Sequence, residues 1–224
     1  LADGPHAFTF TLTDAAGNEG PASDALNITV DTQAPTAPSA IASYADDVAA
    51  FQGASEAAAV SNDNRPGFNI GTGLTDTPTL YVDGVKVAAT YDSGTGTLTP
   101  DVALADGVHA ITHTLTDAAG NQSVPSTAFS LTVDTSGPAK PATPANYADD
   151  VGAITNAAST APVTDDSRPA VQVGKGLTDV PTLYVDGAKV AATYDLTAGT
   201  LTPDVALADG PHAFTFTLTD AAGN

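Results

Sequence analysis

The sequence has no cysteine, no methionine and no tryptophan, and only six of its 224 residues are basic. Without cysteine, the chain can form neither a disulfide nor a thiolate metal site. A formal net charge of −20 makes nucleic acid and anionic membranes poor partners. No signal peptide and no apolar run long enough to cross a membrane is visible, so these residues do not predict membrane insertion.

Catalytic motifs are missing as well. The sequence contains no nucleophile elbow, no zinc-ligating pair of histidines and no phosphate-binding glycine loop. Pairs of aspartates could imitate the carboxylates of a glycosidase, but a pair in every repeat is hard to reconcile with one active site. His6, His109 and His212 recur at one place and His113 replaces a phenylalanine, so we expect structural roles for them. We predict that the chain is not an enzyme.

What the sequence has in abundance is repetition. Residues 1–18, LADGPHAFTFTLTDAAGN, return unchanged at 207–224 and with few changes at 104–121, always at a spacing of 103 residues. The chain starts and stops inside this repeat, as expected for an excerpt of a longer protein. We predict C-terminal strands of a preceding unit at 1–30, a complete unit at 31–133, and a unit lacking its last strand at 134–224. Such an array indicates one structural unit copied for length rather than for chemistry.

Apolar residues alternate with threonine, which predicts β-strands. Residues 7–13 and 26–30 show this period. The full unit is expected to hold about seven strands, near 38–43, 67–70, 79–82, 85–91, 96–99, 109–116 and 128–133, with turns at Asp83-Gly84 and Asp106-Gly107. The Ala-rich stretch 49–60 could form one helical turn. Seven antiparallel strands in about 100 residues predict an all-β fold: tandem immunoglobulin-like sandwiches joined end to end.

The joints between units are short and rich in proline. Residues 30–38 include Pro35 and Pro38, and residues 133–141 include Pro138 and Pro141. Proline fixes φ and favours extended backbone, so we expect stiff spacers rather than free hinges.

The order of short motifs along the repeat resembles bacterial Ig-like repeats, which build the stalks of giant RTX-type and biofilm-associated adhesins. The resemblance implies an extracellular location on a bacterial surface, calcium within or between domains, and type I secretion. The motifs that carry it are Asp134-Thr135 with Pro138, Asp149-Asp150-Val151, Asp166-Ser167-Arg168-Pro169, Tyr184-Val185-Asp186-Gly187, and the segments 207–212 and 219–224.

The acidic residues are almost all of one type. Only Glu19 and Glu56 are glutamate among 26 acidic residues, whereas a surface that is acidic for solubility alone would use both types. Aspartate is the short carboxylate that suits turns and sites for hard cations such as calcium. Immunoglobulin-like topology brings the linker to the same pole as the loops after the second and sixth strands.

Three carboxylates meeting at that pole would repel one another unless a cation joined them. We therefore predict calcium ligands at two joints, which would lock the angle between units: Asp31, Asp76 and Asp117, then Asp134, Asp179 and Asp220, with Asp14 as the copy in the first segment. The simpler alternative for Asp117 is an Asx turn.

A second acidic cluster lies between the first and second strands of each unit. This connection is about 20 residues long, unusual for a compact sandwich, and a metal pinning its ends would keep it ordered. Solvated turns are the alternative. Asn62 stands where Asp165 stands in the copy, and Arg65 and Arg168 are expected to pair with a nearby aspartate. The predicted ligands are Asp46, Asp47 and Asp63, then Asp149, Asp150, Asp165 and Asp166.

These observations favour a structural role: a calcium-stabilised extender repeat of a bacterial cell-surface adhesin, projecting a distal binding region for adhesion or biofilm formation. The expected partners are neighbouring repeats and calcium ions. Two alternatives stay open, a glycan- or protein-binding Ig-like module and an accessory domain of a secreted hydrolase. Because 134–224 lacks a counterpart of 25–30, we also predict that the N-terminal strands of one molecule complete the open sandwich of the next.

Overall fold

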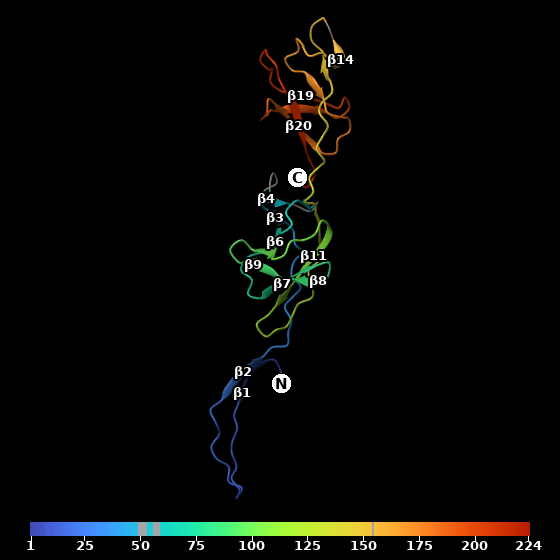
Figure 1. The fold of residues 1–224 in the computed structure, drawn as a ribbon. Helices are drawn as coiled ribbons and strands as arrows, with labels where there is room; N and C mark the ends of the chain where they lie inside the picture. Colours follow the sequence, from blue (N-terminus) through green and yellow to red (C-terminus); the bar gives the residue numbers. More distant parts are fainter. Residues whose placement is uncertain (49–52, 56–58, 154) are drawn as a thin grey trace.

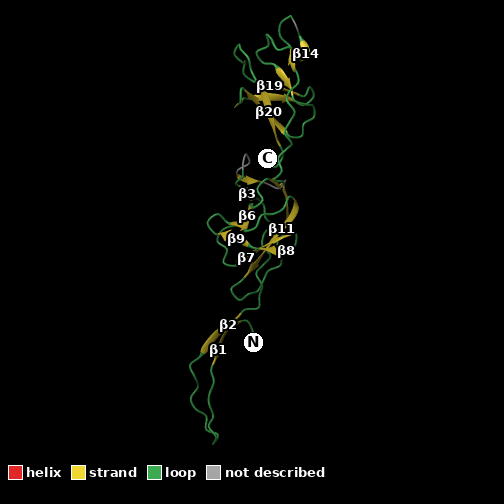
Figure 2. Cartoon of the chain, in the orientation of Figure 1, coloured by secondary structure: helices red, strands yellow, loops and turns green. Residues whose placement is uncertain are grey.

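The computed structural model describes residues 1–48, 53–55, 59–153 and 155–224. These residues form strands, turns and loops and no helix, and they follow one another along an elongated molecule (Figures 1 and 2). A hairpin stands at one end and two β-units follow it (Figure 1). Since the described part of the chain holds no helix, it offers no long apolar helix that could cross a membrane.

The N-terminal hairpin consists of two antiparallel strands, β1 (Gly4–Phe8) and β2 (Leu26–Val30). Gly4 pairs with Val30 and Phe8 with Leu26. Its apolar side chains have no core to enter, so Leu26 and Ile28 are 62% and 45% exposed. The expected half-buried strand at 7–13 is wrong for this copy, because the strand covers only Gly4–Phe8 and is largely exposed.

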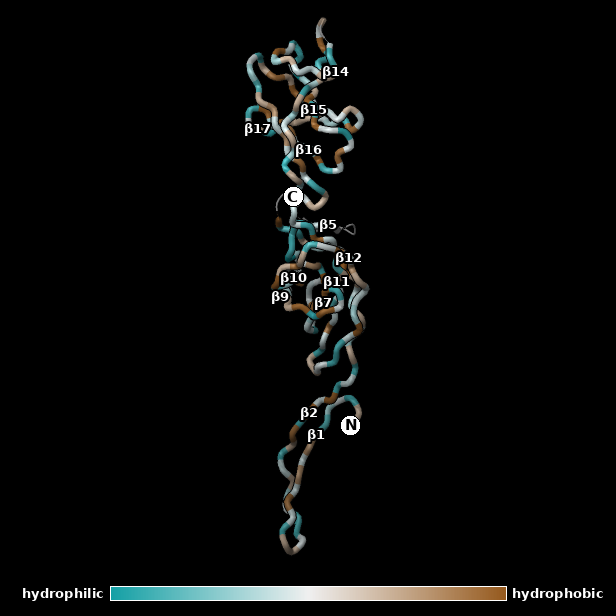
Figure 3. The backbone as a smooth tube through the Cα atoms, turned by 45° about the vertical axis from the view of Figure 1, so that its right-hand side comes forward, coloured by the Kyte–Doolittle hydropathy of each residue, from teal (hydrophilic) through white to brown (hydrophobic). Residues whose placement is uncertain are grey.

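The unit 31–133 is a sandwich of two five-stranded sheets, with strand orders β4-β3-β6-β10-β9 and β5-β12-β11-β7-β8. Its backbone lies between the N-terminal hairpin and the second unit along the chain (Figure 3). Neighbouring strands pair antiparallel except β12 and β5, which pair parallel. The described strands, ten against about seven expected, are β3 (Tyr44–Asp46), β4 (Gly53–Ser55), β5 (Ala59–Ser61), β6 (Gly67–Asn69), β7 (Thr77–Val82), β8 (Val85–Val87), β9 (Ala89–Asp92), β10 (Thr97–Pro100), β11 (Gly107–Thr116) and β12 (Phe129–Val133).

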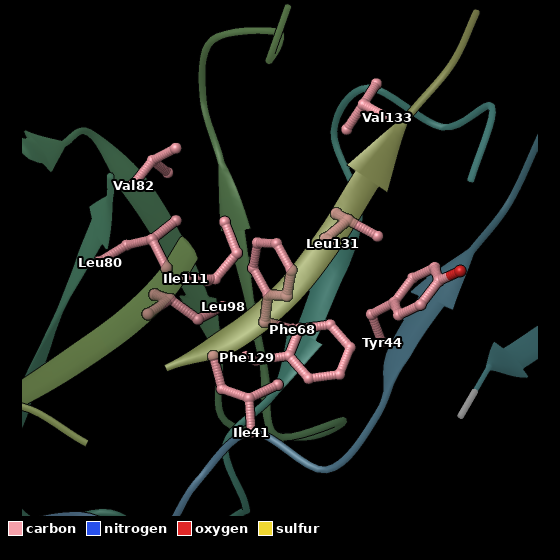
Figure 4. Packing of buried hydrophobic residues seen from close by; sticks show 10 residues of the cluster. All are labelled: Ile41, Tyr44, Phe68, Leu80, Val82, Leu98, Ile111, Phe129, Leu131 and Val133. Atoms are coloured by element: carbon pink, nitrogen blue, oxygen red, sulfur yellow. The ribbon is translucent and has the colours of Figure 1, made fainter. Parts of the chain in front are cut away.

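The core of this unit lies between the two sheets, where aliphatic and aromatic side chains from both meet (Figure 4). Alternate residues of β12, Phe129, Leu131 and Val133, point into it, so this last strand supplies a large share of the buried surface. The rings of Tyr44 and Phe129 pack with their centroids 6.1 Å apart. The all-β sandwich predicted from period-two alternation is confirmed.

The unit 134–224 repeats most of this arrangement. Its sheets have the orders β14-β13-β15-β19-β18 and β17-β16-β20, and its smaller core is formed by Leu183, Val185, Leu201 and Phe216. No described residue of this unit forms a counterpart of β5 or β12. The strands are β13 (Tyr147–Asp149), β14 (Asn156–Ser159), β15 (Ala170–Gln172), β16 (Val180–Val185), β17 (Ala188–Lys189), β18 (Ala192–Asp195), β19 (Thr200–Pro203) and β20 (Phe214–Thr219).

Two local predictions are wrong, and a third falls largely outside the described residues. The first strand lies at Tyr44–Asp46 rather than at 38–43, although Ile41 in the predicted stretch is buried. The predicted strand 85–91 is two strands that belong to different sheets, β8 and β9. Within 49–60, the described residues 53–55 and 59–60 belong to strands, because β4 pairs with β3 and β5 with β12; residues 49–52 and 56–58 lie outside the described residues.

Candidate metal-binding site and joint

The joint between the units is held at the backbone of Asp134. Its amide donates to the carbonyl of Ser61 at 2.9 Å, inside the first unit. Its carbonyl accepts a hydrogen bond of 2.7 Å from Asn224 Nδ2, at the end of the second unit. The carboxylate of Asp134 accepts only locally, from the amide of Ser136 at 3.0 Å. One linker residue is therefore fastened to both units through its main chain.

Asp106, the residue before β11, holds the linker at a second place. Its Oδ1 accepts from the amide of Thr135 at 3.1 Å and from Thr135 Oγ1 at 2.8 Å, and its Oδ2 accepts from Ser136 Oγ at 3.2 Å. The Thr135 hydroxyl, followed by the Thr135 amide, holds the pKa of Asp106 below its usual range. In the hairpin, Asp3 binds Thr32 in the same way, at 3.1 and 2.9 Å. The contact thus recurs with the repeat.

Asp117 belongs to a closed Asx loop rather than to an open carboxylate cluster. Its Oδ1 accepts from the amides of Ala119 and Asn121 at 2.9 and 2.8 Å, and its Oδ2 accepts from Asn121 Nδ2 at 3.0 Å. Asn121 Nδ2 also donates to the carbonyl of Asp31 at 3.0 Å, so the Asn121 side chain links the loop to the linker. These hydrogen bonds, Asn121 first, lower the pKa of Asp117.

The same loop closes around Asp14 and Asp220. Asp220 accepts from the Asn224 amide and side chain at 3.0 and 3.1 Å, and Asp14 accepts from Asn18 at 2.9 and 3.0 Å. The side chain of Asn18 is the largest cause that lowers the pKa of Asp14. The simple turn that was the alternative for Asp117 describes all three copies.

The other residues of the predicted joint sites make local hydrogen bonds. Asp31 accepts from the amide of Gln33 at 3.0 Å, and Asp76 and Asp179 interact with the threonines that precede them. Across the described residues, no three His, Cys, Asp or Glu side chains are arranged to hold a metal ion. The structure joins Asp31 to Asp117 through Asn121 instead, and calcium at the joints stays a prediction.

The second predicted cluster contains two buried carboxylates, Asp46 and Asp63, each 4% exposed. Ser61 links them: its Oγ donates to Asp46 Oδ2 at 2.6 Å and accepts from the amide of Asp63 at 3.0 Å. Asp63 Oδ1 accepts from the amide of Arg65 at 2.7 Å. Burial raises the pKa of Asp63, and the negative charges of Asp47 and Asp46 raise it further. Here the structure does bring predicted ligands together.

The copy in the second unit repeats this link with threonine in place of serine. Thr164 Oγ1 donates to Asp149 Oδ2 at 2.8 Å and accepts from the amide of Asp166 at 3.0 Å, and both carboxylates are buried. Asp150 and Asp165 are exposed beside them. In the first unit the position of Asp165 is held by Asn62, whose buried Oδ1 accepts no hydrogen bond from the residues that the structure describes.

The arginines do not form the expected ion pairs. The Arg65 and Arg168 side chains donate through Nε to the carbonyls of Pro100 and Pro203, at 3.3 and 2.9 Å. Their backbone amides, not their guanidinium groups, bind the buried aspartates. The ion pairs found among the described residues join histidine to aspartate instead.

Residues 39–135 match a bacterial Ig-like domain. The Ig-like match spans all the strands of the first sandwich and ends at Thr135, one residue beyond the Asp134 joint. No curated protein was found to match the chain. A similar solved structure is SGBP-B of the mixed-linkage glucan utilization locus of Bacteroides ovatus, in complex with a mixed-linkage heptasaccharide. The two are 19% identical with a TM-score of 0.29, and all of this chain covers 50% of that one.

Asp106 has a contact in the Ig-like unit that the sequence did not lead us to predict. We interpreted it as a turn residue, yet its carboxylate holds the linker 29 residues further along the chain. The signal was available: a threonine follows the linker aspartate at both joints, as Thr32 and Thr135, and a Leu-Ala-Asp-Gly segment precedes both. Asp83 lies at the turn between β7 and β8 and also joins that turn to β11. Its carboxylate accepts hydrogen bonds from the amide of Ala110 and from the His109 ring, each at 2.8 Å.

Proposed function

We propose that the chain is a structural spacer of a bacterial cell-surface adhesin, built from Ig-like units that extend a distal binding region. The observation that carries this proposal is the joint: one linker residue, Asp134, is hydrogen-bonded to both units, and Asp106 holds the next two linker residues. A linker fixed at three places transmits orientation from one unit to the next. The end-to-end arrangement supports the same role (Figure 1).

Calcium belongs to this proposal as the stabilising ion. The chain offers only oxygen ligands in its acidic clusters, which suits a hard cation. Burial and neighbouring charge raise the pKa of Asp63, so a cation beside Asp46 and Asp63 would remove a charge cost that the fold otherwise bears. The buried Asn62 Oδ1 is one more oxygen of the kind that calcium accepts. Asp46, Asp47, Asp63 and their copies Asp149, Asp150, Asp165 and Asp166 would hold the ion.

The proposed role of calcium is thermodynamic. Without calcium, the highly acidic chain resists compaction and passes a type I secretion channel unfolded. Outside the cell, free calcium at a hundredfold excess over its dissociation constant adds about 2.7 kcal/mol of stability per site. This is a large share of the stability of a domain of this size. The role is mechanical and requires no catalysis.

Thermal unfolding with added calcium tests the proposal. The melting temperature should rise with calcium and fall with a chelator, and Asp63→Asn together with Asp166→Asn should reduce that response. Asp24→Asn, an exposed aspartate outside the predicted clusters, is the matched control and should respond like the unsubstituted chain. A melting temperature that changes with neither calcium nor chelator would contradict the proposed stabilisation by calcium.

The alternative, a glycan- or protein-binding module, is tested with the same chain on a glycan array. Tyrosines are the natural sugar platforms here, and Tyr44 is buried while the hydroxyl of Tyr91 donates to the carbonyl of Gly71 at 2.7 Å. Selective binding to an arrayed glycan would favour the alternative over a spacer.

A further inference from the structure

His109 of β11 has an oxygen acceptor at each of its two ring nitrogens. Its Nδ1 lies 2.8 Å from Asp83 Oδ2, and its Nε2 lies 2.8 Å from the carbonyl oxygen of Ala105. A neutral imidazole has one N–H donor and one lone pair, whereas the imidazolium has two donors. Both oxygens therefore receive a hydrogen bond from the ring only when His109 is protonated.

The second unit repeats this arrangement at the matching positions. His212 Nδ1 lies 2.7 Å from Asp186 Oδ2, and His212 Nε2 lies 2.8 Å from the carbonyl oxygen of Ala208. In each unit the same carboxylate also accepts from the backbone amide of the residue after the histidine, at 2.8 Å. Since the contacts return with the repeat, they belong to the Ig-like unit and not to one local packing accident.

The ring of His109 holds the loop that binds the linker. Ala105 directly precedes Asp106, whose carboxylate accepts three hydrogen bonds from the linker. The same loop is tied on its other side by the amide of Leu104, which donates to the carbonyl of Asn64 at 2.8 Å. His109 therefore connects the β7–β8 turn, through this loop, to the linker between the two units.

Among the charged groups around the ring, the Asp83 carboxylate is the one that the described contacts join to it. The hydrogen bond to the Ala105 carbonyl is the largest cause that raises the pKa of His109, and Asp83 raises it further, against partial burial. The neighbouring strand β12 carries no titratable side chain. The other titratable groups on β11 and on the elements beside it are Tyr81 on β7, Lys86 on β8, Asp101 and Asp106 before β11, His113 on β11, Arg65 beside Asn64, and Asp134 in the linker.

We propose that His109, Asp83 and the Ala105 carbonyl form a protonation-dependent latch, which keeps Asp106 in place on the linker when the ring is charged and releases it when the ring is neutral. A neutral His109 donates to one of its two acceptors and turns a lone pair toward the other. The segment that carries Asp106 then loses one of its two ties. This inference rests on the proposed spacer, since it concerns how firmly the joint holds the units.

The latch closes in mild acid and opens as the pH rises. Because the folded protein raises the pKa of His109, the contribution of its charge is fully present below the unfolded value of about 6.5 and is lost as the pH rises through the higher folded value. Asp106, whose pKa is lowered, stays charged over this range and keeps its bonds to the linker. The joint is therefore stiffest between the protonation of His109 and that of Asp106.

Distances between spin labels on the two units test the latch. Labels at Ser93→Cys and Ala188→Cys are exposed, and the chain has no cysteine of its own. The distance distribution should be narrow at about pH 5 and broaden toward about pH 9. Adding His109→Gln should make its width independent of pH. Adding His113→Phe removes another histidine of the same strand and should leave the pH response intact.

The possible outcomes separate the latch from the spacer. A distribution that is narrow at both pH values would overturn the latch and leave the spacer in place. A distribution that is broad at both would contradict the spacer as well. A pH response that survives His109→Gln would overturn the latch alone.

Nuclear magnetic resonance of the unsubstituted chain tests the latch without relying on a substitution. The Thr135 amide donates to Asp106, so its resonance should shift with the same midpoint as the His109 ring. Its protection factor against hydrogen exchange should fall by about two- to tenfold above that midpoint, the equivalent of one hydrogen bond. Asp83→Asn should move both midpoints to lower pH. A Thr135 amide with no transition at the His109 midpoint would overturn the proposal.

Discussion

At the residue scale, single side chains carry much of what distinguishes one repeat from the next. His113 replaces the phenylalanine found at positions 10 and 216, is 2% exposed, and its Nδ1 has no hydrogen-bond partner among the described residues. Burial lowers its pKa. His109 is the opposite case: the carbonyl of Ala105 and then the Asp83 carboxylate raise its pKa. Two histidines four residues apart therefore respond to acid in opposite directions.

We expect His113→Phe to stabilise the first unit. It removes a buried unsatisfied nitrogen, which gives a gain of about 1 kcal/mol in the free energy of unfolding near neutral pH. Because the folded protein disfavours protonated His113, its contribution to stability is present above the unfolded pKa of about 6.5 and is lost as the pH falls through the lower folded value. The gain should therefore grow toward pH 5. Denaturant unfolding at both pH values checks this, and an unchanged or smaller gain in acid would contradict it.

At the element scale, one sequence forms different strands according to its neighbours. Residues 1–18 and 207–224 are identical, yet the first forms a strand at Gly4–Phe8 and the second at Phe214–Thr219. Gly4–Phe8 is extended against β2, whereas Phe214–Thr219 is extended against β16. β11 has both partners and is ten residues long. The strand is thus decided by which edge is available, not by local propensity.

This dependence explains which parts of the fold could be predicted. The alternation of apolar and polar residues predicted β7, β11 and β12 correctly, because their inward-facing residues contact the core whichever strands they pair with. The first strand was misplaced at 38–43, because its position is set by the pairing partners of Tyr44, which lie on β4 and β6. The link from Ser61 to Asp46 joins residues 15 apart and depends on that pairing, so adjacency of aspartates predicted the cluster but not its serine.

We expect matched substitutions in β12 and β2 to differ sharply in their effect on the free energy of unfolding. Leu131→Ala removes a fully buried side chain and should cost about 2–5 kcal/mol in the free energy of unfolding of its unit. Ile28→Ala, at the equivalent register position, removes an exposed side chain of the isolated hairpin and should change that free energy by less than about 0.5 kcal/mol in dilute solution. Chemical denaturation of the two variants checks this. Equal costs would mean that β2 is already buried.

At the scale of the whole molecule, the proposed spacer role depends on how the joint holds the two units. The linker residues 134–136 accept or donate five hydrogen bonds to Ser61, Asp106 and Asn224. The proline-rich sequence predicted a stiff spacer, but proline constrains only the backbone of the linker itself. The orientation of one unit to the next comes from side chains in both units, which no local pattern in the linker could reveal.

We expect Asp106→Ala with Asn224→Ala to loosen the joint while both sandwiches stay folded. Spin labels at Ser93→Cys and Ala188→Cys report the distance between units, since both sites are exposed and the chain has no other cysteine. Their distance distribution should broaden in the double variant.

Acid should have the same effect on the joint. The Asp106 pKa is lowered by the linker, so its contribution is present above the ordinary pKa of aspartate and is lost as the pH falls through the lower folded value. A distribution that stays equally narrow in the double variant and in acid would assign the stiffness to proline alone.

Small-angle X-ray scattering of the unsubstituted chain, extrapolated to zero concentration, tests the spacer most directly. The account predicts an elongated particle whose two Ig-like units keep one relative orientation, so that a single extended conformation fits the curve. A curve that requires a broad mixture of bent and extended conformations, with the units folded, would contradict it.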